Sequence, residues 1–217
     1  MKTLKEQTDE KVAMGRKANP HFMKSVDEVV NTAKKFQEGK NAVKIDTKAP
    51  NFGLPNAQNE IISLETLIKE GPVVVTFYRG SWCPYCNLQL KTMQSRLADI
   101  HALGAQLVAI SPQVPDNSLS KDEISKMDFI VLSDQDASVA SQYGVAWKVP
   151  EFLTDHMKVD RGLDLESINN GNADILPIPA TYVIGKDGII TWRYLDVDYR
   201  TRAEPEDIID ALKKLAV

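Results

Sequence analysis

The 217-residue sequence contains only two cysteines, no block of lysines and arginines, and no stretch of eighteen consecutive apolar residues. Two cysteines are too few for the disulfide framework of a small secreted domain. The missing basic block and the formal net charge of −4 argue against binding to nucleic acid or to an anionic membrane surface. The sequence offers no candidate for a membrane-spanning helix, and its polar first residues lack the apolar centre of a signal peptide. We therefore expect a cytoplasmic protein.

The first 44 residues differ in character from the rest of the chain. They are polar and rich in lysine, but one amphipathic pattern begins after the pair Asn19-Pro20 and ends near Gly39. Its apolar residues recur at helical spacing and are Phe22, Val26, Val29, Val30, Ala33 and Phe36. This pattern predicts an N-terminal helical extension, residues 1–44, ahead of a main domain, residues 45–217. The helix either packs on that domain or serves as a dimer arm.

Strand-like and helix-like patterns alternate through the main domain. A turn-rich segment at 49–60 predicts a loop and a short hairpin. The predicted strands are 73–78, 106–111, 129–132, 180–184 and 189–194. The predicted helices are 64–70, 84–103, 119–127, 137–143 and 204–215, with no more than a short helix expected in 146–176. Because Asp187-Gly188 is a strong hairpin signal, the pattern ends in a hairpin and a helix. It predicts an α/β fold, a three-layer sandwich on a central mixed sheet.

Both cysteines lie in the segment Phe77–Cys86, directly after the apolar run Val73–Val75. The strand pattern breaks at Gly80, and the thiols follow where a helix should begin, with Pro84 suited to the first helical position. A helix N-terminus stabilises an anion, so we expect a lowered pKa and an available thiolate at Cys83. A disulfide between residues so close in sequence would add little stability, which indicates a redox or nucleophilic role.

A zinc site is the main alternative for the cysteine pair. Zinc would need two more ligands, and the spacing of His21, His101 and His156 is unlike that of a zinc-finger pair. An inert pair of thiols is the other alternative. The sequence also lacks a phosphate-binding glycine loop, so we expect neither a metal nor a nucleotide or flavin cofactor.

Several segments carry a family resemblance. Trp82-Cys83-Pro84-Tyr85-Cys86 resembles the active-site motif of the thioredoxin and glutaredoxin superfamily. Three further segments resemble peroxiredoxins: Ala49–Phe52, Val131–Asp134 with the downstream Tyr143-Gly144, and Pro177–Ile184 with Asp187-Gly188. Residues 45–215 thus look like the alkyl hydroperoxide reductase/thiol-specific antioxidant group, in particular its members with an Arg-Gly-x-Trp-Cys-Pro-Tyr-Cys motif. The tail Arg202–Pro205 is similar to those members too. The resemblance implies a thioredoxin-like fold with peroxiredoxin-type additions.

The chain differs from standard peroxiredoxins around the first cysteine. Gly80 and Thr76 stand where that family carries a Thr or Ser and a Pro, and no arginine precedes the late strand. We expect Arg79 or Arg193 to replace the missing arginine if the fold brings one of them near the thiol, and Ser81 is the nearest hydroxyl.

The chain also differs from thioredoxins, because Phe77 replaces their buried acid. Pro179, however, stands where thioredoxin-fold proteins carry a cis proline that faces the cysteine pair. We therefore include Pro179 among the residues expected to shape the site.

The resemblance implies a thiol-dependent peroxidase in which Cys83 attacks a hydroperoxide and Cys86 is the resolving thiol. A thioredoxin- or glutathione-type donor would reset the disulfide, and a homodimer is compatible with the resemblance. The residues expected to shape the site or stabilise the thiolate are Arg79, Ser81, Trp82, Pro84 and Pro179. Two alternatives remain: a thiol–disulfide oxidoreductase, or a non-enzymatic redox sensor that acts through residues 1–44.

Overall fold

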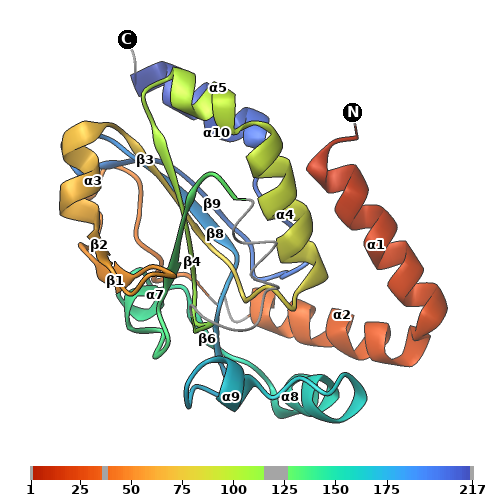
Figure 1. Ribbon diagram of the computed structural model, residues 1–217. Coiled ribbons are helices and arrows are strands. Elements are labelled where there is room, and N and C mark those ends of the chain that lie inside the picture. The colour runs from red at the N-terminus through yellow and green to blue at the C-terminus, as the bar shows by residue number, and fades with distance from the viewer. Residues whose placement is uncertain (1, 36–38, 115–126, 216–217) are drawn as a thin grey trace.

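The computed structural model describes residues 2–35, 39–114 and 127–215. Its centre is a five-stranded mixed sheet with strand order β5-β4-β3-β8-β9 (Figure 1). The strands are β3 (Val73–Phe77), β4 (Gln106–Ser111), β5 (Ile130–Ser133), β8 (Ala180–Ile184) and β9 (Ile190–Leu195). The pairs β3–β4 and β4–β5 are parallel, whereas β3–β8 and β8–β9 are antiparallel. All five strands lie within one or two residues of their predicted positions.

Helices cover both faces of this sheet (Figure 1). One face carries α4 (Pro84–Ser95), α5 (Leu97–Ala102) and α10 (Pro205–Leu215), and the other carries α3 (Leu64–Glu70) and α7 (Ser138–Gln142). Side chains alternate along β3 as a strand requires: Val74 packs under the first group, and Val73, Val75 and Phe77 pack under the second. The predicted three-layer α/β sandwich on a mixed sheet is confirmed.

The single helix predicted for 84–103 is wrong, because the chain breaks at Arg96. This residue has φ −113° and ψ 9°, so α4 ends there and α5 begins. The break lets Leu97 and Ile100 both enter the core on the α10 side. The helix predicted for 119–127 falls on positions that lie, apart from 127, outside the described residues.

Short helices and strands outside the central sheet form in two segments of the main domain, 53–63 and 146–177. The predicted hairpin is present as β1 (Gly53–Pro55) and β2 (Ile61–Ser63), which pair antiparallel. The segment 146–176 holds more structure than its irregular sequence predicted. Its elements are β6 (Ala146–Lys148), α8 (Glu151–Asp155), the π-helical turn η1 (His156–Asp160), α9 (Leu165–Ile168) and β7 (Ile175–Pro177).

The N-terminal segment forms two helices, α1 (Leu4–Ala18) and α2 (Pro20–Lys35), of which only the second was predicted. Thr3 and Glu6 form a reciprocal capping box that begins α1. The side chains of α2 enter the same core as α4, so this helix packs on the main domain, the first of the two predicted alternatives. The boundary at residue 44 stays a prediction.

An ion-pair chain ties both N-terminal helices to the segment before α10. Asp27 on α2 accepts from Arg200 and from Arg16, each at 2.7 Å, and Arg200 also pairs with Asp198 at 2.8 Å. Burial works against the ionisation of Asp27, but hydrogen bonds from Arg200 and Arg16 outweigh it and lower the pKa of this carboxyl. The helical hairpin α1–α2 is therefore fixed to the chain segment that carries Tyr199 and Arg202.

The Glu204 side chain fixes the start of α1. Its carboxylate accepts the backbone N–H groups of Leu4 at 3.0 Å and Lys5 at 2.6 Å, two donors that the helix leaves unpaired. We expect Glu204→Gln to lower the free energy of unfolding by about 1 kcal/mol, because a charged cap is lost. Urea denaturation measures the change, with Glu166→Gln, an exposed glutamate on α9, as control. Equal stability of the two variants would contradict this role.

None of the helices within the described ranges combines the length and the apolar character that crossing a membrane requires.

Candidate functional site

The cysteine segment forms the junction between β3 and α4. After the strand ends, the Tyr78 N–H still donates to Ile110 O at 2.9 Å, and the chain then turns through Gly80. The Cys83 N–H donates to Gly80 O at 3.1 Å, which closes the turn. Cys83 is the N-cap of α4 and Pro84 is its first residue, as predicted.

The two thiols differ in what they face. Both are reduced and buried, with relative exposures of 1% for Cys83 and 0% for Cys86, and they are hydrogen-bonded to each other. Cys83 borders a cavity of about 370 Å³, whereas Cys86 is buried in the core and does not line this space. A small molecule in the cavity therefore meets Cys83 first.

Arg202 supplies the main positive charge at Cys86. Its Nη2 atom donates to Cys86 Sγ at 3.0 Å, and both groups are buried. Burial alone would raise the pKa of Cys86, but the hydrogen bond from Cys83 and the charge of Arg202 lower it well below its ordinary value. The backbone N–H of Arg79 also stabilises the charged sulfur. Of the two sulfurs, Cys86 is therefore the one at which the surroundings favour the thiolate.

The prediction of a lowered pKa for Cys83 is wrong. Burial raises the pKa of Cys83 well above its ordinary value, and the hydrogen bond to Cys86 and the charge on that sulfur raise it further. The charges of Arg79 and Arg202 work in the other direction but do not prevail. A helix N-terminus was the only local effect visible in the sequence, and the neighbouring thiolate outweighs it.

Arg79 is the arginine that the fold brings to the cavity wall. Its guanidinium carbon lies 4.3 Å from the ring centre of Tyr199 and 5.1 Å from that of Trp82. Its Nη2 atom contacts Met157 Sδ at 3.9 Å, and its buried Nε has no hydrogen-bond partner within the described part of the chain. The other candidate, Arg193, donates to two backbone carbonyls of the N-terminal segment and does not line the cavity.

Ser81 lies behind the cysteine turn. Its backbone N–H and its hydroxyl both donate to Gln113 Oε1, at 2.9 and 3.0 Å, and its carbonyl accepts from Asn87 Nδ2 at 2.7 Å. These bonds tie the turn to the segment that follows β4 and to the first turn of α4. The position fits the expected shaping of the site, whereas the hydroxyl does not line the cavity.

The expectation of a cis proline at Pro179 is wrong. Every peptide bond among the described residues is trans, and Pro179 is buried at the start of β8. Its carbonyl accepts from the Asp196 N–H at 3.4 Å, so that the extended chain joins the β8–β9 ladder. Pro179 does not line the cavity beside Cys83.

Gly80 explains why a threonine cannot stand at this position. Its φ is +143°, and an added Cβ would lie 2.3 Å from Trp82 Nε1. We expect Gly80→Ala to destabilise the protein by about 2 kcal/mol more than Gly104→Ala, because overpacking adds to backbone strain. Gly104 is the matched control, since its φ is +71° and, apart from its chain neighbours, no described residue lies within 4 Å of the Cβ that the substitution would add. Thermal unfolding measures the loss of stability, and tryptophan emission reports the displacement of the Trp82 indole. Equal destabilisation of the two variants would contradict the collision with the indole.

Two residues of the site were missed by sequence reasoning. Arg202 and Tyr199 come from the segment before α10, more than a hundred residues after the cysteines. The only signal was the resemblance of the tail Arg202–Pro205 to other family members, which assigned no role to its arginine. Among the described residues no group of three His, Cys, Asp or Glu side chains is placed to hold a metal ion.

Known proteins resemble this chain in sequence. The profile of the AhpC/TSA family matches residues 45–193. A putative peroxiredoxin Bcp of Haemophilus influenzae is 30% identical over 52% of this chain and 72% of its own length. Peroxiredoxin Bcp of Escherichia coli K12 is 29% identical over 52% of this chain and 71% of its own length.

Solved structures give the same fold. Peroxidoxin BcpB of Mycobacterium tuberculosis superposes with a TM-score of 0.61 and 20% identity, over 80% of this chain and 98% of its own. A reduced 2-Cys peroxiredoxin of Plasmodium vivax superposes with a TM-score of 0.58 and 15% identity, over 79% of this chain and 81% of its own. Because the family profile covers most of the chain and includes both cysteines, the protein belongs to the AhpC/TSA family and has a peroxiredoxin-like thioredoxin fold.

Proposed function

We propose that the protein is a thiol-dependent peroxidase in which Cys83 attacks a hydroperoxide and Cys86 resolves the product. Membership in the AhpC/TSA family supports the reaction class. The observation that carries the assignment of the residues is the asymmetry of the pair. Cys83 borders the cavity, and Cys86 lies behind it with its charge held by Arg202.

The first step uses this asymmetry. As Cys83 Sγ attacks the terminal oxygen of the hydroperoxide, its proton passes to the Cys86 thiolate, to which it is hydrogen-bonded. The O–O bond breaks and its electron pair leaves on the alkoxide, which takes up a proton and departs as the alcohol. Cys83 is left as a sulfenic acid.

The second step closes the disulfide. The Cys86 thiolate, regenerated when its proton passes to the alkoxide, attacks the sulfenic sulfur of Cys83, and hydroxide leaves. Overall, one thiol, one thiolate and one hydroperoxide give a disulfide, an alcohol and a hydroxide ion. A thioredoxin- or glutathione-type thiol then returns the pair to the reduced state.

Arg79 is proposed to hold the peroxide oxygens. Its side chain lines the cavity with Cys83, and its buried Nε has no hydrogen-bond partner among the described residues. Trp82 lines the same cavity, but its buried Nε1 lies against Gly80. A donor that meets the charge developing on the leaving oxygen lowers the barrier of the reaction. Arg79 would replace the arginine that standard peroxiredoxins use.

Disulfide exchange is the alternative, because the cysteine pair begins a helix as in thiol–disulfide oxidoreductases. The 1% exposure of Cys83 favours a small hydroperoxide over a protein disulfide as the first oxidant. A protein reductant such as thioredoxin would reach the disulfide only after movement of α1, α2 or η1, whose side chains line the cavity.

Stopped-flow fluorescence of the reduced protein tests this assignment, because Trp82 adjoins Cys83. We expect a phase whose rate rises with the concentration of hydrogen peroxide or cumene hydroperoxide and exceeds that of free cysteine. Oxidised glutathione and a small aromatic disulfide are the comparison oxidants. Faster reaction with the disulfides than with either peroxide would favour the alternative.

A further inference from the structure

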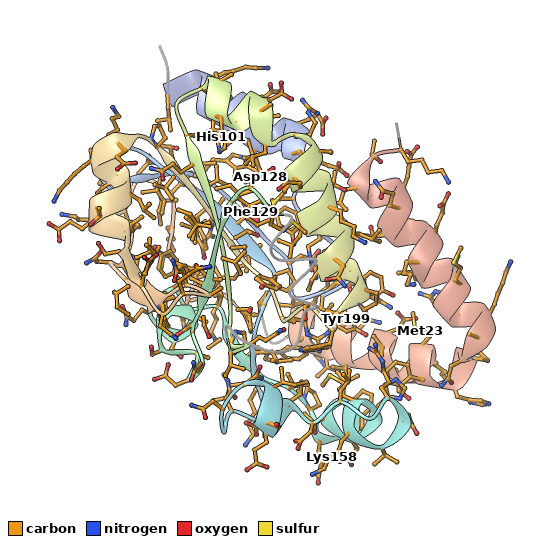
Figure 2. The ribbon with its side chains drawn as sticks, in the orientation of Figure 1. Met23, His101, Asp128, Phe129, Lys158 and Tyr199 are labelled. Carbon is orange, nitrogen blue, oxygen red and sulfur yellow. The ribbon has the colours of Figure 1, made fainter. Side chains whose placement is uncertain are left out.

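The cavity beside Cys83 is built largely by parts of the chain that lie outside the central sheet. Helices α1 and α2, which precede the segment matched by the family profile, supply one wall, and α8 with η1 supplies another. Figure 2 labels Tyr199 near the lower end of α4 and Met23 between α1 and α2, and both residues line the cavity. The N-terminal helices therefore belong to the substrate pocket and are more than an outer cover.

The walls are apolar. The side chains that contribute carbon and sulfur surface include Met14, Phe22, Met23, Leu153 and Met157. Phe22 also stacks on His156 with ring centres 3.7 Å apart, which closes the pocket between α2 and η1. The volume of about 370 Å³ lies within the range of about 300–1,000 Å³ that is typical of small-ligand pockets. Hydrogen peroxide alone would leave most of this apolar surface uncovered.

The charges on the same cavity all have one sign. Lys11, Arg79 and Arg161 line it, and no aspartate or glutamate of the described chain does so. Arg161 donates to Trp82 O at 3.4 Å and Arg79 to a methionine sulfur, and within the described residues none of the three cations forms an ion pair with a carboxylate. Among nearby acids, Asp160 pairs with His156 at 2.6 Å and Asp198 with Arg200 at 2.8 Å. The cavity thus combines an apolar body with uncompensated positive charge.

We infer that the preferred oxidant is an apolar hydroperoxide that carries a carboxylate, with Lys11 and Arg161 as its recognition residues. The apolar part would lie against the methionines and Phe22, the hydroperoxide at Cys83 and Arg79, and the carboxylate at the two exposed cations at the mouth. Apolar surface buried by the ligand supplies the larger share of the binding, and the cations supply the selection between charged and neutral molecules. This inference rests on the proposed peroxidase function.

A matched pair of oxidants tests the inference: cumene hydroperoxide and its ring para-carboxylate, which differ only in the charged group. Single-turnover rates of the reduced protein, each divided by the rate of free cysteine with the same oxidant, give the preference. We expect the wild type to favour the carboxylate about tenfold at low ionic strength, and the preference to fall as salt is added.

Substitutions then locate the selection. Lys11→Gln and Arg161→Gln should each lower the rate with the carboxylate more than the rate with cumene hydroperoxide, so that the preference falls about threefold to fivefold, because each loses one exposed charge. Lys17→Gln on α1 and Lys158→Gln on η1 are the controls, since both lysines are exposed and neither lines the cavity; Figure 2 labels Lys158 at the edge of the molecule.

The outcomes separate this inference from the function on which it rests. Equal corrected rates for the two oxidants, or a preference that survives in the Lys11→Gln/Arg161→Gln double variant, would overturn the inference while leaving the peroxidase intact. Failure of the wild type to react faster than free cysteine with cumene hydroperoxide, its carboxylate and hydrogen peroxide would overturn both.

Discussion

Replacement of Cys83 with serine should abolish the reaction with hydroperoxides, lowering its second-order rate constant on the order of a thousandfold or more. A serine hydroxyl has nearly the size of the thiol but does not ionise at neutral pH, so the reacting atom is lost while the packing is kept. Cys86 cannot take over, because it is fully buried behind Cys83 and does not border the cavity. Stopped-flow measurements over a range of peroxide concentrations give the rate constant.

Cys86→Ser is the matched control for this experiment. Here the first oxidation should persist, because Cys83 keeps its place at the cavity and the charges of Arg79 and Arg202 then act on it alone. The sulfenic acid should accumulate without a disulfide, react with a carbon nucleophile specific for that group, and pass to sulfinic acid in excess peroxide. If Cys83→Ser kept the wild-type rate and Cys86→Ser lost it, the assigned roles of the two cysteines would be reversed.

Removal of the charge of Arg202 should have the second largest effect. The guanidinium lies 3.0 Å from Cys86 Sγ and favours the thiolate of the buried pair. In Arg202→Met the first deprotonation of the pair should move upward by more than one pH unit, each unit being about 1.4 kcal/mol. Less thiolate would then remain at pH 7, so the rate with peroxide should fall about tenfold or more at that pH. The loss should shrink as the pH rises and the thiolate returns.

Ultraviolet absorbance of the thiolate, followed against pH, measures this shift directly. Arg202→Lys keeps the charge and should return the first deprotonation of the cysteine pair most of the way to its wild-type pH. The comparison of the two variants separates the effect of the charge from that of packing. Arg202 also donates to the carbonyls of Tyr199 and Thr201, so near-ultraviolet circular dichroism should accompany each variant to verify the fold. A thiolate titration unchanged in Arg202→Met would contradict the role given to this residue.

Much of the fold could be predicted from hydrophobic pattern alone. The strands Val73–Phe77 and Gln106–Ser111 are apolar on both faces because helices cover the sheet on both sides, and such runs are readable without tertiary information. Helix α1 could not be predicted in the same way. Its side chains are polar almost all round, and only Leu4 and Thr8 are buried, so its stability depends on the capping box and on Glu204.

The candidate site was predictable only where it is local. The position of Cys83 at the start of α4 follows from a strand, a glycine and a proline in sequence. The charge distribution between Cys83 and Cys86 does not follow from the local sequence. It depends on burial and on Arg202, which the fold brings from more than a hundred residues away. The cavity likewise combines α1, α2, η1 and the segment before α10, and no spacing in the sequence relates these four.

Oxidation of the fully reduced wild-type protein with one equivalent of cumene hydroperoxide tests the central claim most directly. The products are quantified as alcohol released, thiols remaining and peptides linked after proteolysis under acidic, thiol-blocking conditions. The account predicts one alcohol per chain, the loss of both thiols together, and a peptide linked between Cys83 and Cys86. Loss of thiols without alcohol, or alcohol formed while Cys86 stays free and Cys83 carries no oxygen, would contradict it.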